Sequence, residues 1–334
     1  MNITVLGAGS WGTTLALLLA KKNNQVKVWE FRPDAASKME AERENKEFLK
    51  GYKFPDNLHV YNDIHWAVDG SKFCLFVVPS HATRPTAKLL ENGLPSDCLI
   101  ASASKGIEQK SLLRMSEVFN DVWGSKFNIN NYVCLSGPSH AEEVVRGLPT
   151  SIVAASTNID SAHQVQNLMS NERFRMYSTD DLIGVELGGS LKNVIAIAAG
   201  ISAGLGFGDN TLGALLTRGL VEMSRLGVHL GGQVGTFSGL SGMGDLITTC
   251  CSQHSRNRYV GEQIGKGRKL QEILDEMLMV AEGVNTTASA WALAQHENIE
   301  MPIAHQVHSI LFEDADPMQA TIDLMTRKLK VEIG

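Results

Sequence analysis

Short apolar runs alternate with longer helix-like segments through the first half of the chain. The runs are rich in β-branched and aromatic residues and lie at positions 3–6, 26–29, 73–78, 98–102, 132–135, 151–154 and 174–177. Such alternation is typical of βαβ units on a parallel sheet. Because these runs hold few polar residues, we expect helices to cover both faces of the sheet.

The pattern changes after about Leu182. The strand-like runs stop, and helical spacing appears in segments 184–202, 212–226, 259–264, 270–277 and 286–296. No linker rich in Pro, Ser or charge marks the change, so two tightly packed domains that share a cleft are expected. We predict an α/β fold, with a doubly wound, mostly parallel sheet in residues 1–185 and a C-terminal all-helical domain in residues 186–334.

Composition supports two ordinary globular domains. The chain has 334 residues, of which 43% are hydrophobic and 20% charged. Its net charge of −6 argues against a general binder of nucleic acid or anionic membranes. Any site for an anion must therefore be local.

The cysteines and the N-terminus indicate a reducing, cytoplasmic setting. Cys74, Cys98, Cys134, Cys250 and Cys251 show no spacing typical of a disulfide framework or a metal site. The opening MNITVLGAG lacks the features of a signal peptide. The longest weakly polar stretch, 194–206, is shorter than the ~20 residues that cross a bilayer, so no membrane span is expected.

A glycine motif follows the first predicted strand. Gly7, Gly9 and Gly12 have G-x-G-x-x-G spacing between ITVL and the helix-like TTLALLLAKK. The first glycine permits a tight turn, the second lets the backbone approach a pyrophosphate, and the third lets the helix pack on the strand. This context predicts a Rossmann-type dinucleotide site; the alternative is a glycine turn without a ligand.

The end of the second predicted strand gives conflicting signals about the dinucleotide. Glu30 lies 18 residues after Gly12, near where an acidic side chain holds the ribose 2′-hydroxyl of NAD. Arg32 stands where a guanidinium binds the 2′-phosphate of NADP, and Phe31 offers an apolar face to adenine. Arg32 is otherwise an ordinary solvated arginine. The choice between NAD and NADP stays open.

Lys192 is a candidate for acid–base chemistry. It lies in an apolar helical segment whose other charge, Glu186, is about 120° away around a helix, so the two do not pair. Small residues surround it at helical spacing, which lets a ligand or the other domain approach. Burial lowers the pKa of a lysine toward neutrality, where it exchanges protons with a carbonyl oxygen. The alternative is a lysine that extends to the surface of a packed helix.

Further polar groups follow predicted strands or glycine-rich segments. Lys105 comes directly after the strand-like LIASA, and the loop 136–141 follows another strand, so both belong at the carboxyl edge of the sheet. Asp245 ends a glycine-rich run that indicates close backbone approach. Ser255 and Arg256 offer a helix N-cap and a guanidinium for a phosphate, or simply a capped surface helix.

Eight segments, in this order, carry a family resemblance over nearly the whole chain: GAGSWGTTLA, VVPSH, SKGIE, SGPSHAEEV, GVELGGSLKNVIAIAAGI, GLSGMGDLITTC, HSRNR and VAEGVNT. Together they resemble bacterial NAD(P)-dependent glycerol-3-phosphate dehydrogenases. The resemblance implies reduction of dihydroxyacetone phosphate to sn-glycerol 3-phosphate with NAD or NADP, a supply role in phospholipid synthesis, and a homodimer as the default assembly.

The resemblance also implies roles for individual residues, with Lys192 as proton donor and acceptor. Residues implied to contact the substrate are Lys105, Gly137, Ser139, Lys192, Asp245, Ser255, Arg256 and Asn257. Residues implied to line the cofactor site, beside Gly7, Gly9 and Gly12, are Ser10, Trp11, Phe31, Arg32, Lys105, Ala141, Arg256, Val280 and Glu282. The sequence departs from the family pattern at Ser139, Ser241 and Glu30, and the last puts dual coenzyme use in doubt.

Three other functions compete with this hypothesis. Ser139, between a strand and a helix, suggests a hydrolase nucleophile, but the motif lacks its closing glycine and leaves the dinucleotide motif unexplained. A noncatalytic dinucleotide sensor has no need of Lys192, Asp245 and Arg256. A two-domain hydroxyacid dehydrogenase is the nearest alternative, and activity on an unphosphorylated carboxylate would favour it.

Overall fold

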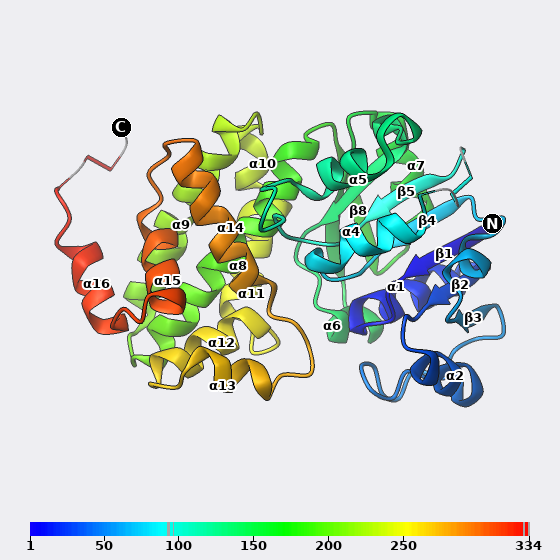
Figure 1. The fold of residues 1–334 in the computed structure, drawn as a ribbon, viewed down its shortest axis with the longest axis horizontal. Coiled ribbons are helices and arrows are strands. Elements are labelled where there is room, and N and C mark those ends of the chain that lie inside the picture. Colours follow the sequence, from blue (N-terminus) through cyan, green and yellow to red (C-terminus); the bar gives the residue numbers. More distant parts are fainter. Residues whose placement is uncertain (92–93, 96, 330, 333–334) are drawn as a thin grey trace.

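The computed structural model describes residues 1–91, 94–95, 97–329 and 331–332. A sheet with flanking helices and a bundle of helices lie side by side (Figure 1). The first part contains β1 (Asn2–Leu6), α1 (Ser10–Lys21), β2 (Gln25–Trp29), α2 (Pro33–Glu42), β3 (Leu58–Tyr61), α3 (Ile64–Val68), β4 (Phe73–Phe76), α4 (Ser80–Leu89), β5 (Leu99–Ser102), α5 (Met115–Trp123), β6 (Tyr132–Ser136), α6 (Ala141–Val145), β7 (Thr150–Ala155), α7 (Ile159–Met169) and β8 (Phe174–Thr179).

The strands form one 8-stranded sheet in the order β3-β2-β1-β4-β5-β6-β7-β8. Every neighbouring pair is parallel except β6 and β7, so the predicted doubly wound, mostly parallel sheet is confirmed. The strand order reverses at β1, which puts a crevice at the carboxyl ends of β1 and β4. The glycine motif begins at that point.

All seven predicted strands are present, and β3 is the one that the sequence pattern missed. Its residues LHVY alternate between buried and partly exposed positions, as expected of a short edge strand. Along β4, successive side chains enter two different cores: Phe73 and Leu75 pack on one face, and Cys74 and Phe76 on the other. Helices therefore cover both faces, as predicted.

The second part of the chain is helical. It contains α8 (Leu182–Gly204), α9 (Asp209–His229), α10 (Val234–Ser238), a π-helical turn η3 (Leu240–Gly244), α11 (Asp245–Cys251), α12 (Arg256–Gly265), α13 (Leu270–Asp275), α14 (Glu282–His296), α15 (Pro302–Phe312) and α16 (Pro317–Met325). The five predicted helical segments correspond to α8, α9, α12, α13 and α14. The sequence pattern did not predict α10, α11, α15 and α16. The first two are short helices on either side of the glycine-rich turn η3.

The central helix α8 is longer than the apolar stretch 194–206 suggested. By length and composition its 23 residues suffice to cross a membrane, but 89% of its most apolar window is buried inside the protein. It is the core helix around which the other helices pack. Glu186 is buried near its start and accepts hydrogen bonds from Arg114 and Ser116, so it does not pair with Lys192, as predicted.

Glycines bring α8 and α12 into close contact. A Cβ on Gly200 would lie 2.0 Å from the carbonyl oxygen of Arg258, and a Cβ on Gly261 would lie 2.0 Å from that of Ile197. The two backbones therefore touch, which larger residues would prevent. This packing fixes the start of α12 relative to Lys192 on α8.

Candidate active site

Three charged side chains from both parts of the molecule meet in one cluster. Lys192 Nζ on α8 lies 2.5 Å from Asp245 Oδ1, and Lys105 Nζ, after β5, lies 2.6 Å from Asp245 Oδ2. Lys192 also donates to the hydroxyl of Thr249, at 2.8 Å. The structure thus brings together three of the predicted site residues, which are separated by up to 140 positions in the sequence.

Burial and charge set the protonation of this cluster. Lys192 is 6% exposed, and its burial, opposed by Asp245 and reinforced by the charge of Lys105, lowers its pKa to about 8. Burial acts to raise the pKa of Asp245, but the two lysines outweigh it and the net pKa is lowered. At neutral pH the cluster therefore holds one carboxylate between two ammonium groups.

Small residues on α8 let the sheet domain approach Lys192. A Cβ on Gly189 would lie 2.6 Å from Ser136 Oγ and 3.6 Å from Lys105 Cδ. A Cβ on Gly188 would lie 2.9 Å from the carbonyl oxygen of Ser241 in η3. The predicted close approach at the glycine-rich run 239–245 is also found, since a Cβ on Gly242 would lie 2.0 Å from the carbonyl of Phe237.

The glycine motif has the shape that a dinucleotide pyrophosphate requires. Gly7 has φ +110°, and a Cβ on Gly12 would lie 1.9 Å from the carbonyl oxygen of Gly7, so the turn is tight and the helix lies close to it. Nothing lies within 4 Å of a Cβ on Gly9, and α1 has no side-chain cap there. The first N–H groups of α1, at Ser10 and Trp11, are therefore open to an anion.

At the end of β2, the predicted acidic and basic side chains belong to one hydrogen-bonded network. Glu30 is 3% exposed and accepts hydrogen bonds from the backbone and side chain of Arg32. The guanidinium of Arg32 also pairs with Glu47. Phe31 is 67% exposed beside them. An apolar face and a carboxylate, which adenosine-binding sites of this fold combine, therefore lie together at the end of β2.

At the start of α12, Ser255 is the N-cap, and its hydroxyl accepts a hydrogen bond from the N–H of Arg258 at 3.2 Å. Arg256 is exposed and donates to the carbonyl of Val280 at 2.8 Å. The side chain of Asn257 is buried and joins Asn193 to the N–H of Gly283. The amide of its side chain therefore has structural partners in the helical part.

Of the other predicted residues, Gly137 borders the charged cluster. Gly137 has φ +141°, and its carbonyl oxygen accepts hydrogen bonds from Ser139 Oγ at 2.9 Å and from Lys105 Nζ at 3.5 Å. Ala141 begins α6 directly after this loop. Glu282, at the start of α14, accepts hydrogen bonds from the backbone N–H and the hydroxyl of Ser80, at 2.9 and 2.5 Å. It therefore ties the helical part to the sheet domain.

Sequence reasoning missed two neighbours of the site, Thr249 and Glu47. Thr249 lies one helical turn after Asp245, a spacing that could have identified it. Glu47 lies outside any motif. His140 packs on His254 with ring centroids 5.7 Å apart, and its Nε2, like the hydroxyls of Ser136 and Ser241, is buried without a hydrogen-bond partner among the described residues.

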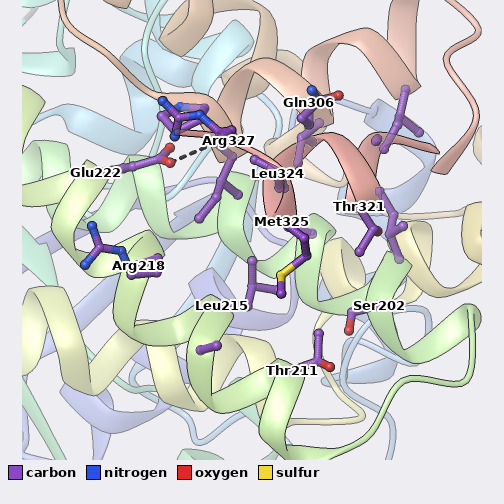
Figure 2. Close-up of a pocket in the computed structure, with 18 of the residues that line it drawn as sticks. Ser202, Thr211, Leu215, Arg218, Glu222, Gln306, Thr321, Leu324, Met325 and Arg327 are labelled. Carbon is purple, nitrogen blue, oxygen red and sulfur yellow. Dashed lines mark hydrogen bonds between the residues drawn. The ribbon is translucent and has the colours of Figure 1, made fainter. Parts of the chain in front are cut away.

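A separate cavity of about 270 Å³ lies between α8, α9, α15 and α16 (Figure 2). Its walls are mostly apolar, and Figure 2 shows Leu215, Leu324 and Met325 around it. It contains none of the residues of the charged cluster. The site built from Lys192 and Asp245 is therefore distinct from this cavity.

Comparisons with known proteins identify the family. Residues 2–162 match the model of the NAD-dependent glycerol-3-phosphate dehydrogenase N-terminus, and residues 181–322 match that of its C-terminus. The chain is 50% identical to a glycerol-3-phosphate dehydrogenase [NAD(P)+] of Chlorobium phaeobacteroides (strain BS1), over 100% of both chains. A relative of the same name from Geobacter sp. (strain M21) is also 50% identical, over 99% of this chain and 98% of the relative.

Solved structures agree with this assignment. The crystal structure of glycerol-3-phosphate dehydrogenase from Coxiella burnetii is 41% identical and superposes with a TM-score of 0.93, covering 98% of this chain and 99% of the other. Both domains and the whole length are thus matched. The chain belongs to the NAD-dependent glycerol-3-phosphate dehydrogenase family.

Proposed function

We propose that this protein reduces dihydroxyacetone phosphate reversibly to sn-glycerol 3-phosphate, with NAD or NADP as coenzyme. The observation that carries the proposal is the Lys192–Asp245–Lys105 cluster, buried where the helical part meets the carboxyl edge of the sheet. The names of the full-length relatives support the same substrate and coenzymes. Oxidation of reduced nicotinamide on addition of dihydroxyacetone phosphate tests the proposal.

Binding of the substrate phosphate is proposed for the start of α12. Arg256 supplies a charge-assisted hydrogen bond, and the first N–H groups of the helix, including that of Asn257, favour an anion. Ser255 caps this turn, while Gly137, Ser139 and Lys105 border the other side. Holding the remote phosphate positions the ketone, so this anchor contributes to turnover as well as to binding.

Proton transfer is proposed for Lys192. The bound nicotinamide supplies the hydride that reduces C2 of the ketone. Lys192 Nζ donates a proton to the oxygen on C2 as charge develops there, and in the reverse direction it accepts that proton. Asp245 holds both lysines in place and keeps Lys192 charged despite its burial, whereas Thr249 orients the ammonium group.

The coenzyme is proposed to lie along the carboxyl edge of the sheet. The pyrophosphate fits the glycine loop and the start of α1, at Gly7, Gly9, Ser10, Trp11 and Gly12. The adenosine end is proposed to meet Phe31 and Arg32. The nicotinamide end is proposed for the interface between the two parts of the molecule, near Lys105, Ala141, Arg256, Val280 and Glu282.

A pH profile is the first prediction. Because the pKa of Lys192 is about 8, kcat/KM for ketone reduction should be highest near pH 7, fall to about half near pH 8, and approach a tenfold fall per unit at higher pH. Oxidation of glycerol 3-phosphate should rise through the same pH, since it needs the neutral amine. Rates measured in both directions between pH 7 and 10 check this. Parallel profiles in the two directions would contradict it.

The phosphate anchor gives the second prediction. Arg256→Ala should raise KM for dihydroxyacetone phosphate by about 30- to 100-fold and lower kcat, because a charge-assisted hydrogen bond of ~2–3 kcal/mol is lost. Arg258→Ala is the matched control, since Arg258 lies on the same helix and pairs with Glu262. Equal effects in the two variants would remove Arg256 from the phosphate site.

The assembly is proposed to be a homodimer. Ile322, Met325 and Leu329, on α16 and after it, are 45%, 79% and 93% exposed, and such an apolar strip is suited to a second copy of the chain. Light scattering should give twice the chain mass of 36.3 kDa, and Met325→Asp should reduce it to one chain. A monomeric wild-type protein would refute the dimer.

Three further assignments remain proposals. The boundary between the domains is placed near residue 185, within the first turns of α8. The protein is proposed to work in the cytoplasm. Because glycerol 3-phosphate is the backbone of phospholipids, its proposed role is to supply their synthesis.

A further inference from the structure

Arg32 is held from two sides at the adenosine end of the proposed coenzyme site. Its Nε donates to Glu30 Oε1 at 2.9 Å, and its backbone N–H donates to the same oxygen at 3.1 Å. Its two terminal nitrogens donate to Glu47, Nη1 to Oε1 at 2.9 Å and Nη2 to Oε2 at 3.1 Å. Each nitrogen of the guanidinium therefore already donates to a carboxylate.

The surroundings hold this arrangement in place. The Arg32 guanidinium carbon lies 5.5 Å from the ring centre of Phe48 and 5.8 Å from that of Phe31. Asn62 donates to the carbonyl oxygens of Glu30 and Phe31, which fixes the backbone before Arg32. The guanidinium therefore has a defined position, and its bidentate end is directed at Glu47.

A 2′-phosphate and a 2′-hydroxyl place opposite demands on this corner. A phosphate carries nearly two negative charges and needs the guanidinium fork, which Glu47 occupies. The negative charges of Glu30 and Glu47 would also repel the phosphate, and only the single positive charge of Arg32 would attract it. A hydroxyl carries no charge and can donate a hydrogen bond to a carboxylate. In NAD-binding folds, an acidic residue at the end of the second strand accepts this hydrogen bond.

We infer that Glu47 is a specificity-determining residue, which favours NADH over NADPH by occupying the arginine that would otherwise bind the 2′-phosphate. The inference rests on the proposed function and deepens it. Glu47 is a cleaner position to mutate than Glu30. Within the described part of the chain, the hydrogen bonds and the ion pair of its side chain are all with Arg32. Glu30 also holds the backbone and is buried.

Titration of the full chain with NADH and, separately, NADPH tests this, with tryptophan fluorescence as the signal of binding. In Glu47→Gln the neutral amide releases the fork of Arg32. We expect the Kd for NADPH to fall about 3- to 5-fold, the scale of one partly exposed ion pair, while the Kd for NADH changes less than about twofold. The ratio of kcat/KM values for the two coenzymes should shift likewise.

Glu42→Gln is the matched control, because it removes the same charge from a neighbouring surface pair, with Lys46 at 3.2 Å, without contacting Arg32. It should leave both Kd values unchanged. In an Arg32→Ala background, Glu47→Gln should improve the Kd for NADPH less than it does with Arg32 present, since only repulsion is relieved and no guanidinium is released.

The outcomes distinguish a failure of the inference about Glu47 from a failure of the proposed function. If Glu47→Gln leaves the ratio of the two Kd values unchanged, or weakens NADPH binding, Glu47 does not oppose the 2′-phosphate and the inference is overturned. An equal gain in Glu42→Gln would also overturn it, because general surface charge would then explain the effect. If the wild-type chain binds neither coenzyme, the proposed function itself fails.

Discussion

Lys192→Ala is expected to lower kcat by about 10³-fold while leaving coenzyme affinity unchanged. A general acid contributes ~10²–10⁴-fold to proton transfer, and no other described side chain occupies the position of this ammonium group. The alanine leaves Lys105 and Asp245 as a complete ion pair, so the buried carboxylate keeps a charged partner. Single-turnover kinetics and coenzyme titration of the purified variant measure the two effects separately.

The variant Thr249→Val serves as the control for this experiment. It removes a hydrogen bond to Lys192 and keeps all three charges, so a loss of only a few-fold is expected. If Lys192→Ala retains near-normal turnover, Lys192 is not the proton donor. If Lys192→Ala loses coenzyme binding together with turnover, Lys192 has a structural role instead.

Asp245→Asn is expected to have the second largest effect, about a 10²-fold loss of reduction rate at pH 7.5. Without the carboxylate, burial and the charge of Lys105 act on Lys192 unopposed, so its pKa falls further below 8 and the amine becomes neutral. The variant should also have a free energy of unfolding lower by ~3 kcal/mol, because Lys105 and Lys192 lose the carboxylate that they share in a buried place.

The pH profile distinguishes this explanation from simple damage to the fold. Activity of Asp245→Asn should partly recover as the pH falls toward 6, because Lys192 then regains its proton. Thermal unfolding of the variant shows separately how much stability is lost. A pH optimum identical to that of the wild type would show that Asp245 does not control the protonation of Lys192.

The sheet could be predicted because its strands carry a strong local signal. Runs such as FCLFVV are apolar on both faces, and each forms a strand with two cores beside it. The edge strand β3 is half exposed and lacks that signal. The short helices α10 and α11 lie on either side of η3, and the close approach of Gly188 on α8 to Ser241 in η3 is a long-range contact that local patterns do not reveal.

The site could be predicted in part. Lys192 stands out as a lysine in an apolar helix, and Lys105 follows a strand, so topology directs it to the correct edge. The pairing of both with Asp245 depends on how the helical part packs on the sheet, which no local spacing encodes. Glu47 carries no sequence signal at all, and its contact with Arg32 arises from the chain segment after α2.

The most direct test of the central claim is the absorbance of reduced nicotinamide when purified protein receives dihydroxyacetone phosphate. The account predicts rapid oxidation of NADH, slower oxidation of NADPH, and loss of both with Lys192→Ala. Absence of oxidation with either coenzyme, or oxidation only with unphosphorylated keto acids, would contradict it.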